Sequence, residues 1–350
     1  MPEQVHEDRH EEVYGATFAL YGEKEIKEFI EPLVIRFQRN GIDPQAVFSG
    51  KTCLDAGCGG GRGAIFMLMN GAKSVTAFDY SPTNVETAIA NARKFGFDNI
   101  TGHPGTLADL PFDDGAFDFL WCNGVIHHTA QPDKCLREVT RVLTTNGQAW
   151  FYLYGVGGAY WYSIRRFRAI LAPVDTKACM GALQLMRYQT RFVAEFIDDW
   201  KVPFLRTYTN ADVATRLKEL GFADPKPLPY GVDYDTNHIV NTYPEEVKWL
   251  GGGELRYLVT KTAPQQAGGH PLSASEYGSD VPFADGLVAV LKPPFDGLEK
   301  SVAGSPVLAV AACAFIQKRL RELLSDKGPF PMDEYVAVLE HVTGLTRSWA

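Results

Sequence analysis

CLDAGCGGGRGAIF, residues 53–66, places a glycine-rich turn between two apolar runs. Glycine occupies positions 57, 59, 60, 61 and 63. The pattern predicts a buried strand that ends at Asp55 and a helix that starts near Gly63. Glycine permits a tight turn and leaves no Cβ between the backbone and whatever lies against it, so we expect a ligand to pack on this loop.

The chemistry around the turn narrows the ligand to two classes. A helix N-terminus offers N–H groups and the positive end of a dipole, which favour an anionic group. Asp55 stands two positions before the first glycine, so the ligand is also expected to carry a cation near its anionic group. The amino acid end of S-adenosylmethionine (SAM) meets both conditions. A dinucleotide stays open as the alternative, because Asp79 at the end of the next strand could accept the ribose hydroxyls of either ligand.

Short strands and amphipathic helices alternate from residue 50 onward, which predicts a parallel sheet with helices on both faces. Ser81 is expected to cap a helix that starts at Pro82 and ends at Gly96. The other expected helices span residues 24–39, 64–69, 132–143 and 210–220, and the expected strands span residues 52–56, 75–78, 99–103, 117–122, 148–154 and 255–260, with a further run around 226–230. Two tail helices are expected, one from Pro306 to Gly328 and one that closes the chain before Gly344.

The segment 105–143 carries further motifs in a fixed order: Leu110-Pro111-Phe112, the acidic turn 113–115, Phe117-Asp118 and His127-His128. With the glycine turn, they resemble class I SAM-dependent methyltransferases, specifically the small-molecule UbiE/Coq5-like (methyltransferase type 11) group. The resemblance covers about residues 50–155. It implies SAM as the cofactor and an α/β, Rossmann-like fold with a seven-stranded mixed sheet and helices on both faces. The residue pattern outside this region adds a helical lid insertion and a C-terminal helical appendage.

On this resemblance, the chain is expected to have six parts: an N-terminal helical segment (1–49), the SAM-binding core (50–154), the lid insertion (155–206), completion of the core (207–262), a linker (263–281) and the appendage (282–350). The resemblance implies that Asp55, Gly57, Cys58 and Gly59 lie at the methionine end of SAM and that Asp79 and Tyr80 lie at its ribose. It also implies that Thr106 and Leu107 lie at the adenine and that Asn123 lies near the sulfonium. The family usually has Gly-Asp-Ala where this chain has Gly105-Thr106-Leu107, but a threonine hydroxyl can accept the same hydrogen bond.

Methyl transfer from a sulfonium requires alignment of the acceptor and exclusion of water, and it needs a base only when the acceptor is a hydroxyl or a charged amine. His127 and His128 follow the fourth strand and are the candidate catalytic residues, since either imidazole could take a proton near neutral pH. The alternative for each histidine is that it shapes the loop and caps its helix.

The insertion 155–206 holds nine aromatic residues and eight Lys or Arg against four Asp or Glu. A positive, aromatic cover favours a small-molecule acceptor with a planar body or an acidic group. The alternative is a set of helices that pack these rings into their own core.

Composition restricts the class of protein. The 350 residues are 45% hydrophobic and carry a net charge of −8, which suits a globular domain and disfavours a nucleic-acid partner. There is no signal-peptide pattern and no run of about 18 apolar residues, so no membrane span is expected. Six cysteines without a C-x-x-C pair indicate reduced thiols and a cytoplasmic location. No metal site is predicted, because His6 and His10 are interpreted as part of a solvated acidic arm at the N-terminus. Tyr14, in the same region, could close over SAM.

The sequence therefore predicts a cytoplasmic SAM-dependent methyltransferase that acts on a small molecule. Three alternative functions stay open: a methyltransferase for a macromolecule such as tRNA or protein, a dinucleotide-dependent oxidoreductase, and a SAM-binding module without catalysis. A homodimer through the C-terminal helices is also possible on this sequence.

Overall fold

The computed structural model describes residue 13 and residues 21–266, 268–269, 271–272, 275–276, 283–326 and 328–349. The chain forms two compact units, which are described separately. Unit 1 contains residues 1–155, 203–231 and 254–276, and unit 2 contains residues 156–202, 232–253 and 277–350.

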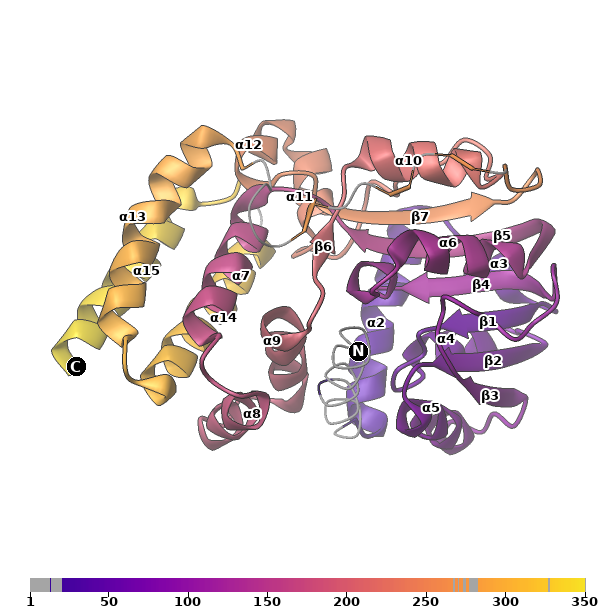
Figure 1. Cartoon of the computed structure of the whole chain (residues 1–350), viewed down its shortest axis with the longest axis horizontal. Coiled ribbons are helices and arrows are strands. Elements are labelled where there is room, and N and C mark those ends of the chain that lie inside the picture. Colours follow the sequence, from indigo (N-terminus) through magenta and orange to yellow (C-terminus); the bar gives the residue numbers. More distant parts are fainter. Residues whose placement is uncertain are drawn as a thin grey trace. The chain divides into compact units, whose positions relative to one another are not determined.

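Unit 1 is built on one mixed sheet, with strand order β3-β2-β1-β4-β5-β7 (Figure 1). Its strands are β1 (Thr52–Ala56), β2 (Ser74–Asp79), β3 (Ile100–Pro104), β4 (Phe117–Asn123), β5 (Leu143–Tyr154) and β7 (Glu254–Thr260). Only β7 runs antiparallel to its neighbour. A second, two-stranded sheet pairs β6 (Arg206–Thr207) with β8 (Ser275–Glu276). The helical elements are α2 (Glu23–Arg39), α3 (Pro44–Phe48), α4 (Arg62–Met69), α5 (Pro82–Lys94), the 3-10 turn η1 (Ile126–His128), α6 (Pro132–Arg141) and α10 (Asn210–Glu219).

This arrangement confirms the predicted Rossmann-like α/β fold. Ser81 caps α5 as expected, since its Oγ accepts the Asn84 N–H at 3.4 Å. Pro32 lies inside α2, which continues on both sides of it.

The predicted seven-stranded sheet is wrong by one strand, because the described sheet has six. The run around residues 226–230 was the expected seventh strand. The Leu228 N–H donates to the Arg256 carbonyl of the neighbouring strand at 2.6 Å. Its neighbours Pro227 and Pro229 have no N–H to donate, so a regular ladder cannot form there.

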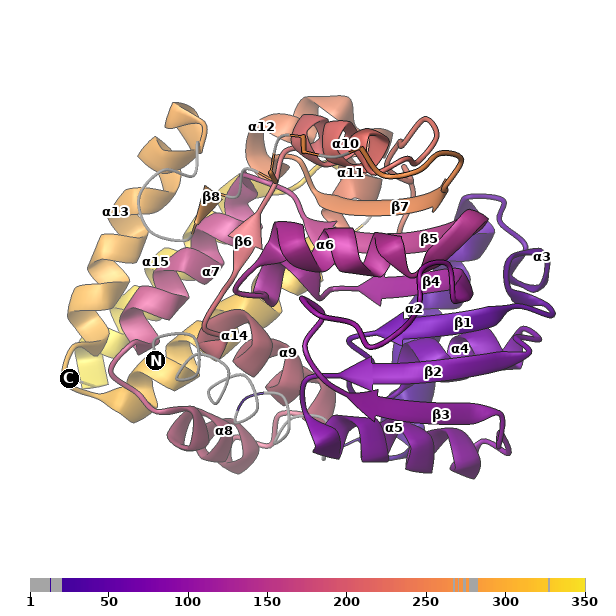
Figure 2. The same cartoon turned by 45° about the vertical axis from the view of Figure 1, so that its right-hand side comes forward.

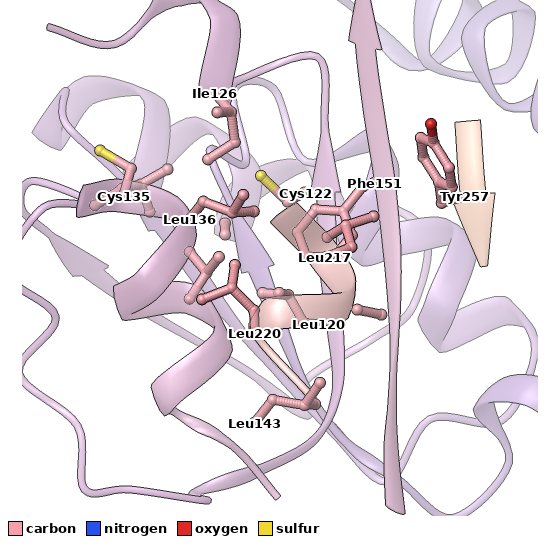
Figure 3. Close-up of a cluster of buried hydrophobic side chains, with 14 of the residues drawn as sticks. Leu120, Cys122, Ile126, Cys135, Leu136, Leu143, Phe151, Leu217, Leu220 and Tyr257 are labelled. Atoms are coloured by element: carbon pink, nitrogen blue, oxygen red, sulfur yellow. The ribbon is translucent and has the colours of Figure 1, made fainter. Parts of the chain in front are cut away.

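Apolar side chains alternate between the two faces of the sheet, so each face has its own core. On one face, residues such as Leu120 and Phe151 pack under α6 and α10 (Figure 3), with α6 lying over β4 and β5 (Figure 2). On the other face, α2, α3, α4 and α5 cover Phe119, Trp121 and Trp150. The central parallel strands β1 and β4 are covered on both sides, whereas the edge strand β3 is mostly exposed.

The second core centres on a stack of three rings. The Trp121 and Trp150 rings are 5.0 Å apart and 8° from parallel, and Phe37 of α2 stacks on Trp150 at 5.2 Å. All three side chains are buried. This stack fixes α2 against the middle of the sheet.

Unit 2 is helical in its described residues. Its elements are α7 (Gly158–Leu171), α8 (Thr176–Leu185), α9 (Thr190–Lys201), α11 (Thr236–Thr242), the 3-10 turn η2 (Pro244–Glu246), α12 (Val247–Leu250), α13 (Asp285–Val302), α14 (Pro306–Ser325) and α15 (Met332–Trp349). Figure 1 shows α13 and α15 side by side, and they pack together with α14 and α7. Among the described residues, no helix combines the length and the apolar character that crossing a bilayer demands.

Two features of unit 2 differ from the sequence expectation. Helix α13 was not predicted, because its sequence contains Pro293-Pro294 and proline removes helix hydrogen bonds. Burial of Leu287, Leu291 and Phe295 on one side of α13 offsets that loss. Helix α15 was expected to end before Gly344, but it continues to Trp349.

A polar cluster joins three helices inside unit 2. Asp199 of α9 accepts hydrogen bonds from Tyr160 Oη of α7 at 2.7 Å and from Gln317 Nε2 of α14 at 2.5 Å. Arg321 of α14 donates to Tyr160 Oη at 2.8 Å. Burial raises the pKa of Asp199 to about 7, although Arg321 opposes the shift. Several lid aromatics pack within the same unit, with Phe196 stacked on Trp200 at 5.1 Å.

The ring stack generates a stability prediction. Replacement Phe37→Ala should lower the free energy of unfolding by about 3–5 kcal/mol, because it removes a buried ring and leaves a cavity against Trp150. Urea unfolding followed by tryptophan fluorescence measures the change. Met69→Ala is the control, since Met69 is 52% exposed, and should cost less than about 0.5 kcal/mol. Equal effects of the two changes would contradict the role of the stack.

Candidate functional site

The carboxyl ends of β1, β2, β4 and β5 meet at one edge of the sheet. The strand order reverses between β1 and β4, and ligands of open α/β sheets bind at such a reversal. The glycine turn follows β1, and the histidine pair follows β4. The topology therefore brings the two predicted halves of the site to the same edge.

The glycine turn is hydrogen-bonded to the end of β2. The N–H groups of Gly57 and Cys58 donate to the Phe78 carbonyl at 2.8 and 3.0 Å. The Gly59 N–H donates to Asp79 Oδ2 at 2.9 Å. Gly59 is thus bonded to Asp79, a second predicted cofactor residue, while Gly57 and Cys58 are bonded to Phe78, the residue before Asp79.

Part of the bare backbone serves the protein's own packing. Gly57 has a φ of +84°, and a Cβ there would lie 2.4 Å from the Val125 side chain. Gly61 has a φ of +87°, and a Cβ there would lie 2.8 Å from the Ala88 Cα of α5. Both contacts are closer than a real Cβ tolerates, so these glycines are required before any ligand arrives. The sequence alone had suggested only the ligand as the reason.

Asp55 is buried beneath the turn, with 2% of its surface exposed. Its Oδ2 accepts the Ala64 N–H in the first turn of α4 at 2.7 Å. Burial raises the pKa of Asp55 to about 7, while that hydrogen bond and nearby Arg62 oppose the shift. The carboxyl group thus ties β1 to α4, and its predicted contact with a ligand stays a prediction.

Asp79 ends β2 and collects several donors. Its Oδ1 accepts the Ser81 N–H at 3.0 Å and the Asn84 Nδ2 at 3.1 Å. Burial raises the pKa of Asp79, and the hydrogen bonds from Gly59 and Ser81 act against the rise. The neighbouring Tyr80 side chain is exposed. The Tyr80 backbone N–H is a fourth donor to this carboxyl group, so protein donors already satisfy Asp79, and its predicted contact with the ribose hydroxyls stays a prediction.

The segment after β3 continues the same edge. The Gly105 N–H donates to the Asp79 carbonyl at 2.9 Å, which places Thr106 and Leu107 next to the end of β2. Thr106 is exposed, and its Oγ1 accepts the Ala108 N–H at 3.2 Å. Leu107 is buried. The threonine hydroxyl is therefore on the surface of the edge, where a ligand can reach it.

Asn123 connects the edge to the ring stack. Its Oδ1 accepts the indole N–H of Trp150 at 2.9 Å, so the amide orientation is fixed by a buried donor. Asn123 is the last residue of β4, beside the switch point.

His127 is fully buried, and neither ring nitrogen has a hydrogen-bond partner among the described residues. Its ring stacks on Tyr154 at 3.7 Å and meets Tyr152 edge-on at 6.1 Å. Burial, aided by nearby His128 and Arg206, holds the pKa of His127 well below its ordinary value, so the ring is neutral at pH 7. Buried polar groups without partners are rare and point to a function or to an unseen partner.

His128 is held by the backbone of the segment before β6. Its Nδ1 lies 2.8 Å from the Phe204 carbonyl oxygen, and since a carbonyl only accepts, Nδ1 carries the proton. Arg206 donates to the carbonyl of Thr129, the next residue. The sequence left open whether His128 shapes its loop, and this bond is consistent with that role.

Sequence reasoning missed four residues around the histidines. Tyr152 and Tyr154 alternate at the end of β5, and Arg256 of β7 lies opposite Tyr152 with its guanidinium 4.3 Å from that ring. Arg206 is buried and lies over the Phe204 ring at 4.6 Å. The period-two pattern of the expected strand 148–154 could have placed both tyrosines on one face. Nothing in the sequence paired them with Arg256.

Three remaining sequence features lie outside the described residues: His6, His10 and Tyr14. The aromatic residues 160–200 of the predicted lid insertion belong to unit 2.

Residues 54–151 match a protein-family model described as "Methyltransferase domain". A ubiquinone biosynthesis O-methyltransferase from Caulobacter vibrioides is 38% identical over 118 residues, which are 33% of this chain and 46% of that protein. A tRNA U34 carboxymethyltransferase from Campylobacter curvus is 33% identical over 111 residues, 31% of this chain and 36% of that protein. An arsenite methyltransferase from Aquipseudomonas alcaligenes is 31% identical over 125 residues, 33% of this chain and 36% of that protein. The matched region spans less than half the length of each of these relatives.

The raised pKa of Asp55 predicts a pH dependence. A carboxyl group whose pKa is about 7 when folded and about 4 when unfolded makes the protein less stable as the pH rises from 4 to 7, because the unfolded chain loses its proton first. The slope contributed is at most about 1.4 kcal/mol per pH unit. In Asp55→Asn this contribution should vanish, while Asp98→Asn, an exposed control at the other end of the sheet, should keep it. Urea unfolding at pH 4, 5, 6 and 7 measures the slope, and identical slopes in both variants would contradict the prediction.

Proposed function

We propose that this chain is a class I SAM-dependent methyltransferase of the UbiE/Coq5-like type and that it transfers a methyl group from SAM to a small-molecule acceptor; the match of residues 54–151 to a methyltransferase domain supports the proposal. The observation that carries the proposal is the shared edge. An acid-flanked glycine turn, bonded to Asp79 through the Gly59 N–H, adjoins a buried histidine that stacks on Tyr154.

The donor half of the proposed site uses the turn and the ends of β2, β3 and β4. SAM, when bound, supplies a methyl group already activated by a positively charged sulfur. Asp79 would accept the ribose hydroxyls, and the Thr106 hydroxyl would accept a hydrogen bond from the adenine amino group. Asn123, with its amide fixed by Trp150, would lie near the sulfonium. The remaining cofactor residues, Asp55, Gly57, Cys58, Gly59, Tyr80 and Leu107, would shape the turn and the walls.

The acceptor half would use the histidine and tyrosine rings. A planar acceptor fits beside stacked rings, because aromatic faces and edges attract each other in such arrangements. The guanidinium groups of Arg206 and Arg256 make the surroundings positive, which favours an acidic group on the acceptor. These contacts support an acceptor that is small, planar and acidic.

His127 would act as the base where the acceptor is a hydroxyl. Transfer then breaks the methyl–sulfur bond, forms a methyl–oxygen bond and moves the hydroxyl proton to a ring nitrogen of His127. The low pKa keeps that nitrogen unprotonated at neutral pH, and an acidic group on a bound acceptor would raise the pKa towards the value that a general base needs. The acceptor hydroxyl would also give the buried ring the hydrogen bond that it lacks among the described residues.

A macromolecular acceptor is the second candidate, favoured by the match to a tRNA-modifying relative. The net charge of −8 weighs against it, since RNA binding depends on neutralising phosphates. We also propose a cytoplasmic location. In support, all six cysteines are buried and unpaired.

An assay of SAM consumption separates these candidates. The wild-type protein is incubated with SAM and, in separate reactions, with small phenols and aromatic acids, with bulk tRNA and with protein extract. We expect S-adenosylhomocysteine to form with the small planar acceptors. Turnover with tRNA or protein alone would replace the proposal by the second candidate, and no turnover with any of them would leave a SAM-binding module.

Asp79→Asn should weaken SAM binding at least about tenfold, because the change removes a charged acceptor at the proposed ribose contact. Isothermal titration calorimetry with SAM measures the dissociation constant. Asp98→Asn is the matched control and should bind like wild type. An unchanged dissociation constant in a folded Asp79→Asn protein would remove Asp79 from the cofactor site.

His127→Ala should leave SAM binding unchanged and lower kcat about a hundredfold or more with a hydroxyl acceptor, as expected for loss of a general base. The rate is measured with the acceptor found in the panel, at several pH values. His127→Gln, which keeps a hydrogen-bonding group but cannot act as a base, should be equally slow. If either variant turned over at the wild-type rate, His127 would not be the base.

A further inference from the structure

The segment after β7 runs back along α6. We call the described residues of this segment, 261–266, 268–269, 271–272 and 275–276, the strap. At the C-terminal end of α6, Lys261 Nζ donates to the carbonyls of Thr140 and Leu143 at 2.8 and 2.7 Å. One turn earlier, Gln265 Nε2 donates to the Arg137 carbonyl at 2.8 Å. The strap therefore follows α6 from its end towards its beginning.

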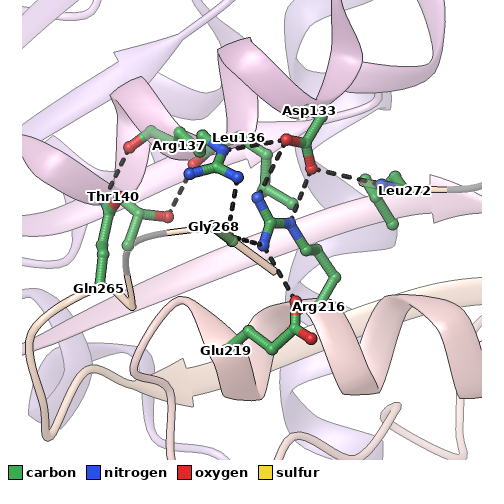
Figure 4. Close-up of polar contacts among 9 residues, drawn as sticks. All are labelled: Asp133, Leu136, Arg137, Thr140, Arg216, Glu219, Gln265, Gly268 and Leu272. Atoms are coloured by element: carbon green, nitrogen blue, oxygen red, sulfur yellow. Dashed lines mark hydrogen bonds and ion pairs between the residues drawn. The ribbon is translucent and has the colours of Figure 1, made fainter. Parts of the chain in front are cut away.

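At the beginning of α6 the strap meets a charged cluster (Figure 4). Arg137 donates to the Gly268 carbonyl at 2.8 Å. The Leu272 N–H lies 3.3 Å from Asp133 Oδ1, which accepts it. Asp133 is in the first turn of α6, so the strap is bonded to both ends of this helix.

Arg216 of α10 is the centre of that cluster. It is 1% exposed, and its Nε and Nη2 donate to the two carboxylate oxygens of Asp133 at 2.7 and 2.9 Å. Its Nη1 donates to Glu219 at 3.0 Å. Burial alone would raise the pKa of Asp133, but the hydrogen bonds from Arg216 and Arg137 outweigh it, and the pKa lies below its ordinary value. Two parallel hydrogen bonds from the guanidinium fix both the distance and the orientation of the Asp133 carboxylate relative to Arg216. A lysine ammonium cannot reproduce this orientation.

The same elements hold the histidine loop, which we define as residues 126–129. It precedes α6 by two residues, so the position of Asp133 sets where the loop ends. On its other side, the strap continues into β8, which pairs with β6 at Arg206 and Thr207. Figure 2 shows β8 beside β6. The segment around β6 supplies the Phe204 carbonyl that accepts from His128 and the Arg206 side chain that donates to Thr129.

We propose that Arg216 is a positioning residue for the histidine loop, acting through Asp133 at the start of α6 and through the strap that connects to β6. The proposal deepens the proposed function and rests on it for the catalytic meaning of the loop. Arg216 touches no reacting atom. It sets the orientation of His128 through the Phe204 carbonyl and, one residue away, the placement of His127.

The test uses three variants of the full chain and one control. Arg216→Met removes the charged fork, Arg216→Lys keeps the charge without the fork, and Arg137→Met breaks only the bond to Gly268 and one bond to Asp133. Lys218→Met removes an exposed cation from the same helix as a control. The readouts are the ¹⁵N signals of the His128 ring, assigned with His128→Gln, the SAM dissociation constant, and kcat and KM with the acceptor found in the panel.

We expect Arg216→Met to shift the His128 Nδ1 signal and to lower kcat about tenfold to a hundredfold, because small displacements of catalytic groups are costly. SAM affinity should change less than about threefold, since the cofactor half is held by other bonds. Arg216→Lys should show a smaller shift of the His128 Nδ1 signal and a smaller loss of kcat than Arg216→Met. Arg137→Met should also shift this signal less than Arg216→Met, and Lys218→Met should match the wild type.

An unchanged His128 signal in folded Arg216→Met would overturn the proposal. If Arg216→Met does not fold, because it leaves Asp133 buried without its main partner, the other variants decide. Wild-type His128 signals in both Arg216→Lys and Arg137→Met would then overturn it. The ring signals and SAM binding need no acceptor, so failure to find methyl transfer would refute the proposed function without touching this outcome.

Discussion

The hydrogen bonds between the glycine turn and the end of β2 are the constraint on which the site depends. Gly57 and Cys58 donate to the Phe78 carbonyl, and Gly59 donates to the Asp79 carboxylate. They require a backbone path that only glycine follows at Gly57, where a side chain would strike Val125. Because Val125 belongs to the segment after β4, the same close approach sets the distance between the donor half and the acceptor half of the proposed site.

Electrostatics at this edge are governed by burial. Burial raises the pKa of Asp55 and Asp79 although backbone donors oppose the rise, and burial lowers the pKa of His127 and keeps its ring neutral. Groups that resist ionisation can change charge when a ligand supplies a partner. A cationic ligand end near the acids and an acceptor proton near the histidine would each supply one.

The helices on the two faces of the sheet in unit 1 hold the residues at this edge in place. The ring stack of Phe37, Trp150 and Trp121 reaches the site through Asn123. On the opposite face, α6 is held at its start by Arg216 and at its end by Lys261. The helices on each face of the sheet are thus linked to the site through a hydrogen-bonded side chain or loop. Substitutions far from the ligand can therefore alter the geometry of the site.

The sequence by itself determined the order of strands and helices from residue 50 to 154, the start of α5 at Ser81-Pro82 and the match of residues 54–151 to a methyltransferase domain, because these depend on local periodicity, capping and contiguous motifs. Tertiary structure decided the rest. The seventh strand is lost at Pro227 and Pro229, and α13 persists through Pro293-Pro294 because its buried side chains outweigh the missing bonds. The partners of His127, Gly57 and Arg216 lie far away in the sequence, and which distant groups meet is set by packing, which local patterns do not encode.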